Sequence, residues 1–151
     1  MKKWTEEEFI NAYKKLKSSG LNDKEIANGL GLSTASEVEQ LLYYYRTLKN
    51  DSRFNNILKD LKKRVDDGKI VPLCNLDVAY SCPRIFVNTA VTVLRNDGYN
   101  CYPAKIRPNR LSMFGINDKI NEDECPFVII HFLTNPESTY EELLDFVFDH
   151  L

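Results

Sequence analysis

A stripe of polar side chains recurs along an apolar stretch near the middle of the chain. Arg84, Asn88, Thr92 and Arg95 follow one another at intervals of four, four and three residues. On an α-helix this spacing places all four on one face. Arginine can pair with guanine through two hydrogen bonds and asparagine with adenine, so the stripe has the chemistry to read DNA bases. The alternative is that it is the solvated outer face of an amphipathic helix.

Further cations flank this stretch on both sides, at positions suited to phosphate oxygens. We predict phosphate contacts from two groups, and their members are Lys59, Lys62, Lys63, Lys105, Arg107 and Arg110. The first group belongs to a basic run on a predicted helix. A plainly solvated helix face and a dimer helix are the alternatives for that run.

The net charge of −2 conceals a strong asymmetry along the chain. Residues 1–67 carry 13 Lys and Arg against 11 Asp and Glu, and residues 68–110 carry 6 against 2. Residues 111–151 carry 1 against 9, a net charge of −8. This division favours a nucleic-acid contact in the first two thirds of the chain, with the acidic end either facing away from phosphate or serving as a docking surface.

Other chemistry finds little support in the sequence. There is no glycine-rich phosphate loop and no nucleophile elbow, so we expect no enzyme activity and no cofactor. The four cysteines form no CxxC pair, which argues against a metal site and indicates reduced thiols. His131 beside Cys125 is better explained as a core or edge histidine than as part of a catalytic dyad. No apolar run is long enough to cross a membrane, and we expect a cytoplasmic protein.

The N-terminal third contains a turn flanked by helices. Residues 22–33 read NDKEIANGLGLS, and a third helix is predicted over residues 34–49. Ala27 is small enough for two helices to cross closely, and Gly31 permits the turn. On these residues the segment resembles the helix-turn-helix family. The resemblance implies a three-helix unit over residues 1–50, whose third helix would contact DNA through Ser36, Gln40 and Tyr44.

One position departs from the helix-turn-helix pattern. Glu37 stands where the family has an apolar residue, and Val38 follows it, which predicts a turn one residue longer than usual. Glu37 and Glu39 at the start of this helix would repel phosphate. A small three-helix packing module is therefore the alternative for this unit.

The rest of the chain is predicted as a linker helix over residues 51–67 and an α+β half over residues 68–151. Its expected order is a short edge strand at 69–73, a short helix, the striped helix at 83–96, a strand at 99–107, a loop or wing at 109–124, a central strand at 126–134 and a last helix. This β-α-β-β-α order resembles the winged-helix family, in which the second helix enters the major groove and the hairpin lies along the backbone.

The sequence therefore predicts a DNA-binding protein of phage or mobile-element type. It would act on double-stranded DNA as a transcription regulator or accessory factor, and a homodimer is considered. The alternative is a protein-interaction module, such as a virus-encoded inhibitor of a host enzyme, that uses its acidic C-terminal surface to bind a host protein.

Overall fold

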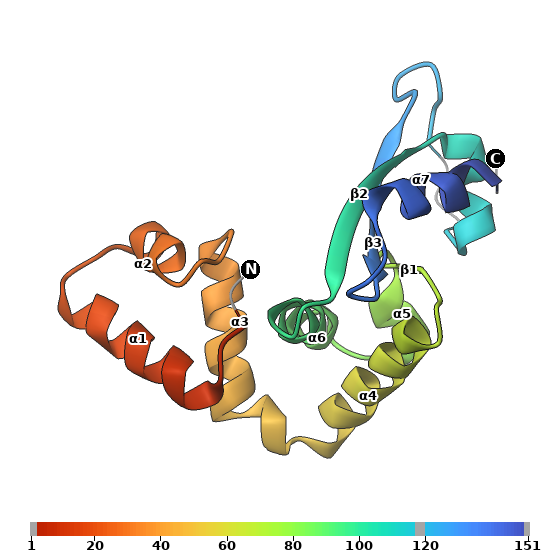
Figure 1. Cartoon of the computed structure of the whole chain (residues 1–151). Helices are drawn as coiled ribbons and strands as arrows, with labels where there is room; N and C mark the ends of the chain where they lie inside the picture. Colours follow the sequence, from red (N-terminus) through yellow and green to blue (C-terminus); the bar gives the residue numbers. More distant parts are fainter. Residues whose placement is uncertain (1–2, 117–119, 150–151) are drawn as a thin grey trace. The chain divides into compact units, whose positions relative to one another are not determined.

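The computed structural model describes residues 3–116 and 120–149. In this part the chain is α+β, mostly helical, with a small three-stranded antiparallel sheet (Figure 1). The chain divides into two compact units, neither of them continuous in sequence. Unit 1 comprises Met1–Lys62 and Cys82–Gly98, and unit 2 comprises Lys63–Ser81 and Tyr99–Leu151. This division differs from the predicted one (1–50, 51–67 and 68–151), because the striped helix packs with the N-terminal helices.

The helices of unit 1 are α1 (Glu6–Ser18), α2 (Asp23–Gly29), α3 (Ala35–Arg46), the 3₁₀ segment η1 (Leu48–Asn50), most of α4 (Ser52–Asp66), and α6 (Arg84–Asn96). Of these, α1, α2 and α3 each begin after a capping side chain, whereas α6 follows Pro83 without one. The predicted caps Thr5 and Thr34 accept hydrogen bonds from the first turns of α1 and α3. The third helix ends at Arg46, earlier than predicted, and residues 48–50 continue as a 3₁₀ turn.

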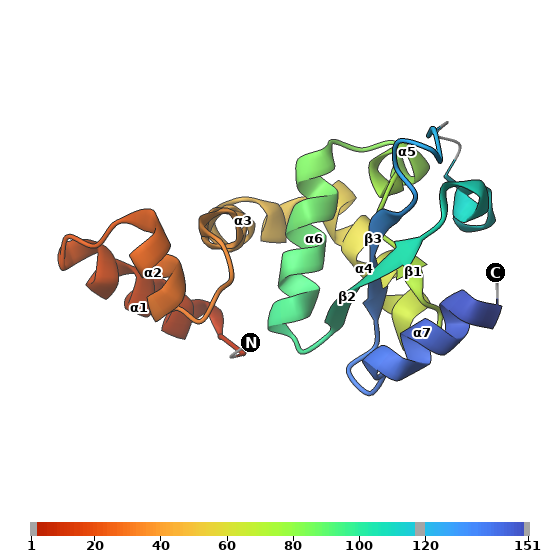
Figure 2. The ribbon, with the colours of Figure 1, turned by 90° about the horizontal axis from the view of Figure 1, so that it is seen from above.

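The core of unit 1 joins the N-terminal helices to α6. Its buried members are Phe9, Ile26, Ala27, Leu30, Leu32, Val38, Leu41, Leu42 and Val93, of which the last belongs to α6. Gly31 has a φ of 73° and lies in the turn between α2 and α3, where a left-handed backbone favours glycine. Trp4 connects the segment before α1 to the end of α2, because its indole Nε1 donates a hydrogen bond to the Leu30 carbonyl over 2.8 Å. Figure 2 shows α3 and α6 side by side.

Unit 2 is built on the sheet, whose strand order is β1-β3-β2. Its elements are β1 (Val71–Pro72), α5 (Leu76–Tyr80), β2 (Asn100–Ile106), the 3₁₀ segment η2 (Pro108–Phe114), β3 (Val128–Thr134) and α7 (Tyr140–Asp149). The predicted central strand is central, and the strand containing Pro72 lies at an edge. The predicted loop at 109–124 instead begins with η2, in which Leu111 is buried, and residues 117–119 of it lie outside the described part.

The two faces of this sheet differ in what covers them. Ala104, Ile106, Ile130 and Phe132 point to one face and pack with Leu143 and Val147 of α7. Because side chains alternate along a strand, the residues between them point to the other face. On that other face Leu133 is buried, whereas Ile129 and His131 are exposed.

Candidate nucleic-acid interface

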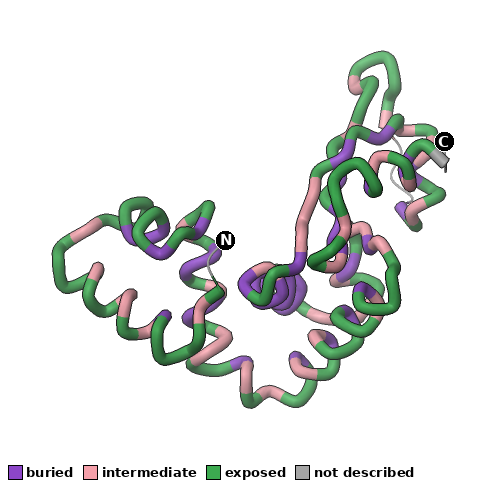
Figure 3. The backbone as a smooth tube through the Cα atoms, viewed as in Figure 1, coloured by how far each residue is buried: buried purple, intermediate pink, exposed green. Residues whose placement is uncertain are grey.

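Helix α6 carries the polar stripe, and the structure divides the stripe in two. The helix starts after Pro83, whose φ of −60° suits its place at the N-cap, and Gly98 follows its end with a φ of 101°. Arg84 and Asn88, in the first turns, are exposed. Most residues after Asn88 are buried (Figure 3). Only the N-terminal half of α6 is therefore presented to solvent as the base-reading prediction requires.

Thr92 is one of the two stripe residues that the fold uses internally. It is 4% exposed, and its hydroxyl donates to the side-chain oxygen of Gln40 on α3. Both residues were predicted to contact DNA, one from each candidate recognition helix. The bond satisfies Thr92, because a buried hydroxyl is costly without a partner. In this conformation Thr92 is not available to a base, which corrects its prediction, whereas Gln40 is half-buried and accepts this bond through its side-chain oxygen.

Arg95 is the second stripe residue that is engaged within unit 1. Its guanidinium lies 3.3 Å from the carboxylate of Glu37, whose side chain is 8% exposed. Glu37 was predicted to face solvent and repel phosphate, and that prediction is wrong. Glu37 stands where proteins of the helix-turn-helix family have an apolar residue. Its carboxylate is buried, as Val38 is, because Arg95 of α6 neutralises it.

The remaining part of α3 offers a shallow pocket rather than a basic face. Ser36, Glu39, Gln40 and Tyr43 line it together with Ile85 of α6, around a volume of about 390 Å³. Ser36, for which a DNA contact was predicted, is exposed. Tyr44 is half-buried, with its ring centroid 5.7 Å from that of Phe54. Burial is the main cause that raises the pKa of the Tyr44 hydroxyl, followed by the charge of Asp97.

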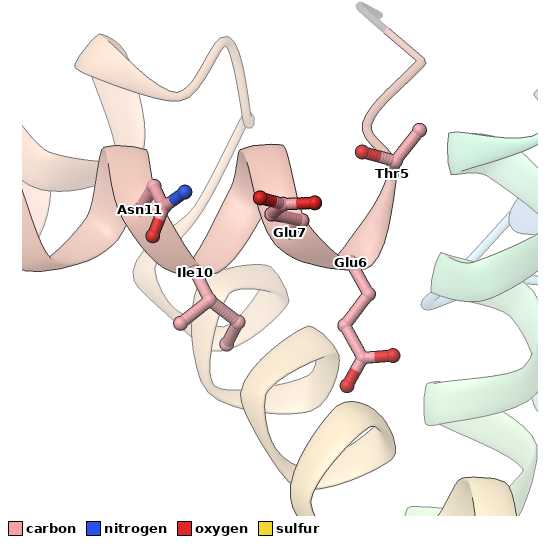
Figure 4. A pocket seen from close by; sticks show the side chains of 5 residues that line it. All are labelled: Thr5, Glu6, Glu7, Ile10 and Asn11. Atoms are coloured by element: carbon pink, nitrogen blue, oxygen red, sulfur yellow. The ribbon is translucent and has the colours of Figure 1, made fainter.

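A second, larger pocket lies at the start of α1 (Figure 4). It has a volume of about 640 Å³ and is lined by Thr5, Glu6, Glu7, Ile10 and Asn11. Figure 4 shows Glu6 and Ile10 extending to the same side of the helix. The carboxylate of Glu6 pairs with Lys49 at 2.7 Å. Two carboxylates and no basic side chain line this pocket, so it does not suit a phosphate group.

The cations of α4 differ in their neighbours. Lys59 and Lys62 are exposed. Lys63 bridges to Asp67 at 2.8 Å, four residues on, and this hydrogen bond lowers the pKa of the Asp67 carboxyl. Lys63 is thus partly neutralised by a carboxylate just after the end of α4, whereas the side chains of Lys59 and Lys62 are exposed. Of the predicted phosphate contacts on α4, those two have the more suitable surroundings.

The cations of unit 2 lie on and after β2. Lys105 and Arg107 are exposed, and Arg110 is half-buried in η2. Lys105 lies opposite Ile129 in the strand register, and Pro103 lies opposite His131. These four residues therefore share the open face of the sheet.

Sequence reasoning missed the open sheet face. Ile129 is 60% exposed and Phe127, just before β3, is 48% exposed, in the segment that was predicted as the central strand. The signal was present in the alternation of VIIHFLT, which places His131 and Ile129 on one face and Ile130 and Phe132 on the other.

Metal-binding clusters and membrane-spanning helices are both absent from the described residues. No group of three or more His, Cys, Asp or Glu side chains in the described ranges could hold a metal ion. None of the described helices combines the length and the apolar character that crossing a bilayer requires. Comparison with protein families, curated proteins and solved structures found no match.

Proposed function

We propose that the protein binds double-stranded DNA, as a transcription regulator or accessory factor of phage or mobile-element type. The observation that carries the proposal is the division of α6. Its exposed N-terminal half presents Arg84 and Asn88, while its second half is anchored to α3 through Thr92 and Arg95. Recognition helices contact base edges mainly through their N-terminal residues, and a fixed second half would hold those residues in place.

The order of elements around α6 also supports the proposal. The chain runs α4, β1, α5, α6, β2, β3, and the two long strands are antiparallel neighbours. This is the order that the winged-helix resemblance implies, with α6 as the base-reading helix. The segment between β2 and β3 departs from a simple hairpin, because it contains η2.

Phosphate contacts would come from exposed cations on each unit. On α4 these are Lys59 and Lys62, and after β2 it is Arg107, which the half-buried Arg110 follows in η2. Each neutralised phosphate releases condensed counterions, so binding should weaken steeply as salt rises.

The proposal is tested by replacing Arg84 and Asn88 together with alanine. Binding sites are first selected from a random duplex pool, and fluorescence anisotropy then compares the selected site with a scrambled one. A bidentate contact contributes about 1–3 kcal/mol of discrimination, so the variant should lose roughly 10- to 100-fold or more of its preference. Binding to the scrambled site should change far less, because the other phosphate contacts remain.

The matched control replaces Asn11 and Lys15, an exposed Asn and cation at the same spacing on α1. This variant should keep its preference. An unchanged preference in the Arg84 and Asn88 variant, with its fold intact by circular dichroism, would remove the base-reading role.

A protein-interaction module is the second candidate, and one observation favours it. The exposed side of α7 carries Glu141, Glu142 and Asp145, together with Phe148 at 67% exposure. Acidic groups around an exposed aromatic ring suit a basic protein surface, such as that of a host enzyme. An electrophoretic shift with random duplex DNA at low salt separates the two candidates, since no binding at micromolar protein would favour this one.

A further inference from the structure

Helix α7 presents an acidic stripe on the side away from the sheet. Its residues Leu143 and Val147 are 0% and 3% exposed and pack into the core of unit 2. Glu141, Asp145 and Phe148 are spaced four and three residues apart, so they lie together on the opposite side of the helix. All three are exposed, and Phe148 is the most exposed aromatic side chain among the described residues. This acidic stripe therefore combines negative charge with an apolar group that the described residues of unit 2 leave largely exposed.

The open face of the sheet has the complementary composition. It carries Lys105 and the exposed Ile129 in register, with the exposed His131 two residues further along β3, and the exposed Phe127 immediately precedes this strand. Neither β2 nor β3 contains a carboxylate. The open sheet face thus has a cation beside exposed Ile and Phe side chains, and the acidic stripe of α7 has carboxylates beside an exposed Phe. The two surfaces are complementary in charge, and both have exposed apolar groups. Exposed apolar groups gathered in this way mark contact surfaces more often than single ones do.

We propose that the open sheet face of one molecule binds the acidic stripe of α7 of a second copy of this chain. The contact would bury Phe148 against Phe127 and Ile129 and place Glu141 and Asp145 beside Lys105. It would cover the second face of the sheet with a helix, as α7 of the same chain already covers the first, which is a common layer arrangement. Half of the open face is apolar, which favours a protein partner over phosphate.

The geometry of unit 2 determines the kind of assembly. The open sheet face and the outer side of α7 lie on opposite sides of the same sheet, because α7 packs on the other face. Two copies joined in this way leave one open face and one acidic stripe unused. The contact is therefore head-to-tail, and further copies can add to either end. The two surfaces are small, so the association should be weak and should be seen at high protein and low salt.

The test is a charge exchange followed by analytical ultracentrifugation over a range of protein concentrations. Lys105→Glu and Asp145→Lys should each weaken self-association by about three- to tenfold, since each replaces an attraction with a repulsion. The chain carrying both substitutions should recover most of the loss. An equal mixture of the two single variants should also recover most of the loss, because the two unchanged surfaces fit each other and the two exchanged surfaces carry opposite charges.

Further variants separate this contact from a general charge effect. Glu7→Lys, an exposed carboxylate of α1, makes the same change in net charge as Asp145→Lys and should leave association unchanged. Phe148→Ser should weaken association at high salt as well, where charge attraction is screened.

A wild-type chain that stays monomeric at all concentrations overturns the proposal, as does a double variant that shows no recovery. No DNA is present in this experiment, so its failure is independent of the proposed DNA binding. If Lys105→Glu weakens DNA binding and the wild type never self-associates, the sheet face serves the nucleic acid instead.

Discussion

Single side chains in this protein are explained by partners at very different distances along the chain. The helix caps were predictable, because Thr5 and Thr34 bond to backbone groups only three residues away. The bonds from Gln40 to Thr92 and from Glu37 to Arg95 join residues 52 and 58 positions apart. No local pattern distinguishes such a residue from a solvated one, which is why four side chains were predicted to face solvent and instead face each other.

Tyr45 gives a pH-dependent prediction at the scale of one residue. Burial raises the pKa of its hydroxyl to about 12, with a further contribution from Tyr44, whose ring centroid is 5.2 Å away. A tyrosine in the unfolded chain has a pKa of about 10. The folded state therefore favours the neutral phenol. The resulting stability is fully present below pH 10 and is lost as the pH rises toward 12.

Urea unfolding across this range measures the effect. The free energy of unfolding should fall less steeply with pH in the Tyr45→Phe variant than in the wild type. Tyr43→Phe, which removes a more exposed phenol from the same helix, is the control and should follow the wild type. Equal slopes for all three proteins would show that Tyr45 does not titrate late.

At the scale of elements, α6 is a structural partner of α3, whatever its exposed N-terminal half contacts. Its amphipathic pattern, its start near Pro83 and its end at Gly98 were all readable from the sequence. The second half of its polar stripe, Thr92 and Arg95, was wrongly predicted to contact DNA. A polar stripe that packs against another helix and one that faces water have the same composition. What distinguishes them is complementarity with α3, which depends on tertiary packing and not on periodicity.

The α3–α6 contact makes an asymmetric stability prediction. The side chain of Arg95 is 32% exposed and can reach water if Glu37 is removed, so Glu37→Ala should cost about 1–2 kcal/mol. Removing Arg95 leaves a carboxylate buried without its cation, and Arg95→Ala should cost more, about 3 kcal/mol. The fluorescence of Trp4, the only tryptophan, reports urea unfolding of this unit.

A double-mutant cycle completes this test. The Glu37 and Arg95 substitutions should show a coupling of about 1–2 kcal/mol. The more exposed pair between Glu6 and Lys49 serves as the comparison and should give only about 0.2–1 kcal/mol. Additive effects of Glu37 and Arg95, or equal costs for the two single substitutions, would contradict the role given to this buried pair.

At the scale of the whole chain, the structure has the predicted class but not the predicted division. An α+β chain with a central strand near its C-terminal end followed from the apolar periodicities. The break predicted near Gly68 followed from a helix end and a composition change, and the sequence around it carries no sign that residues 82–98 return to the first unit. Domain boundaries read from local signals fail when a unit is built from separated segments.

Truncation tests this division directly. A chain of residues 1–67 would have all of the predicted N-terminal unit and linker but would lack α6. It should unfold without a cooperative transition, since Val93 is missing from its core and Glu37 has lost Arg95. A chain of residues 1–98 contains every element of unit 1 and should recover the transition. Equal cooperativity in the two fragments would show that the N-terminal helices fold without α6.

The interleaving of the two units also bears on how the protein forms during synthesis. The N-terminus of a chain leaves the ribosome first and usually folds first. Here the backbone of Trp4 forms hydrogen bonds with the side chain of Asn96. The Asn96 amide donates to the Trp4 carbonyl and accepts from the Trp4 N–H, each over 3.0 Å. Trp4 thus completes these hydrogen bonds only after a residue 92 positions later has been made. A ribosome that pauses before α6 would leave the N-terminal helices with an unfinished core, exposed to chaperones and to other nascent chains.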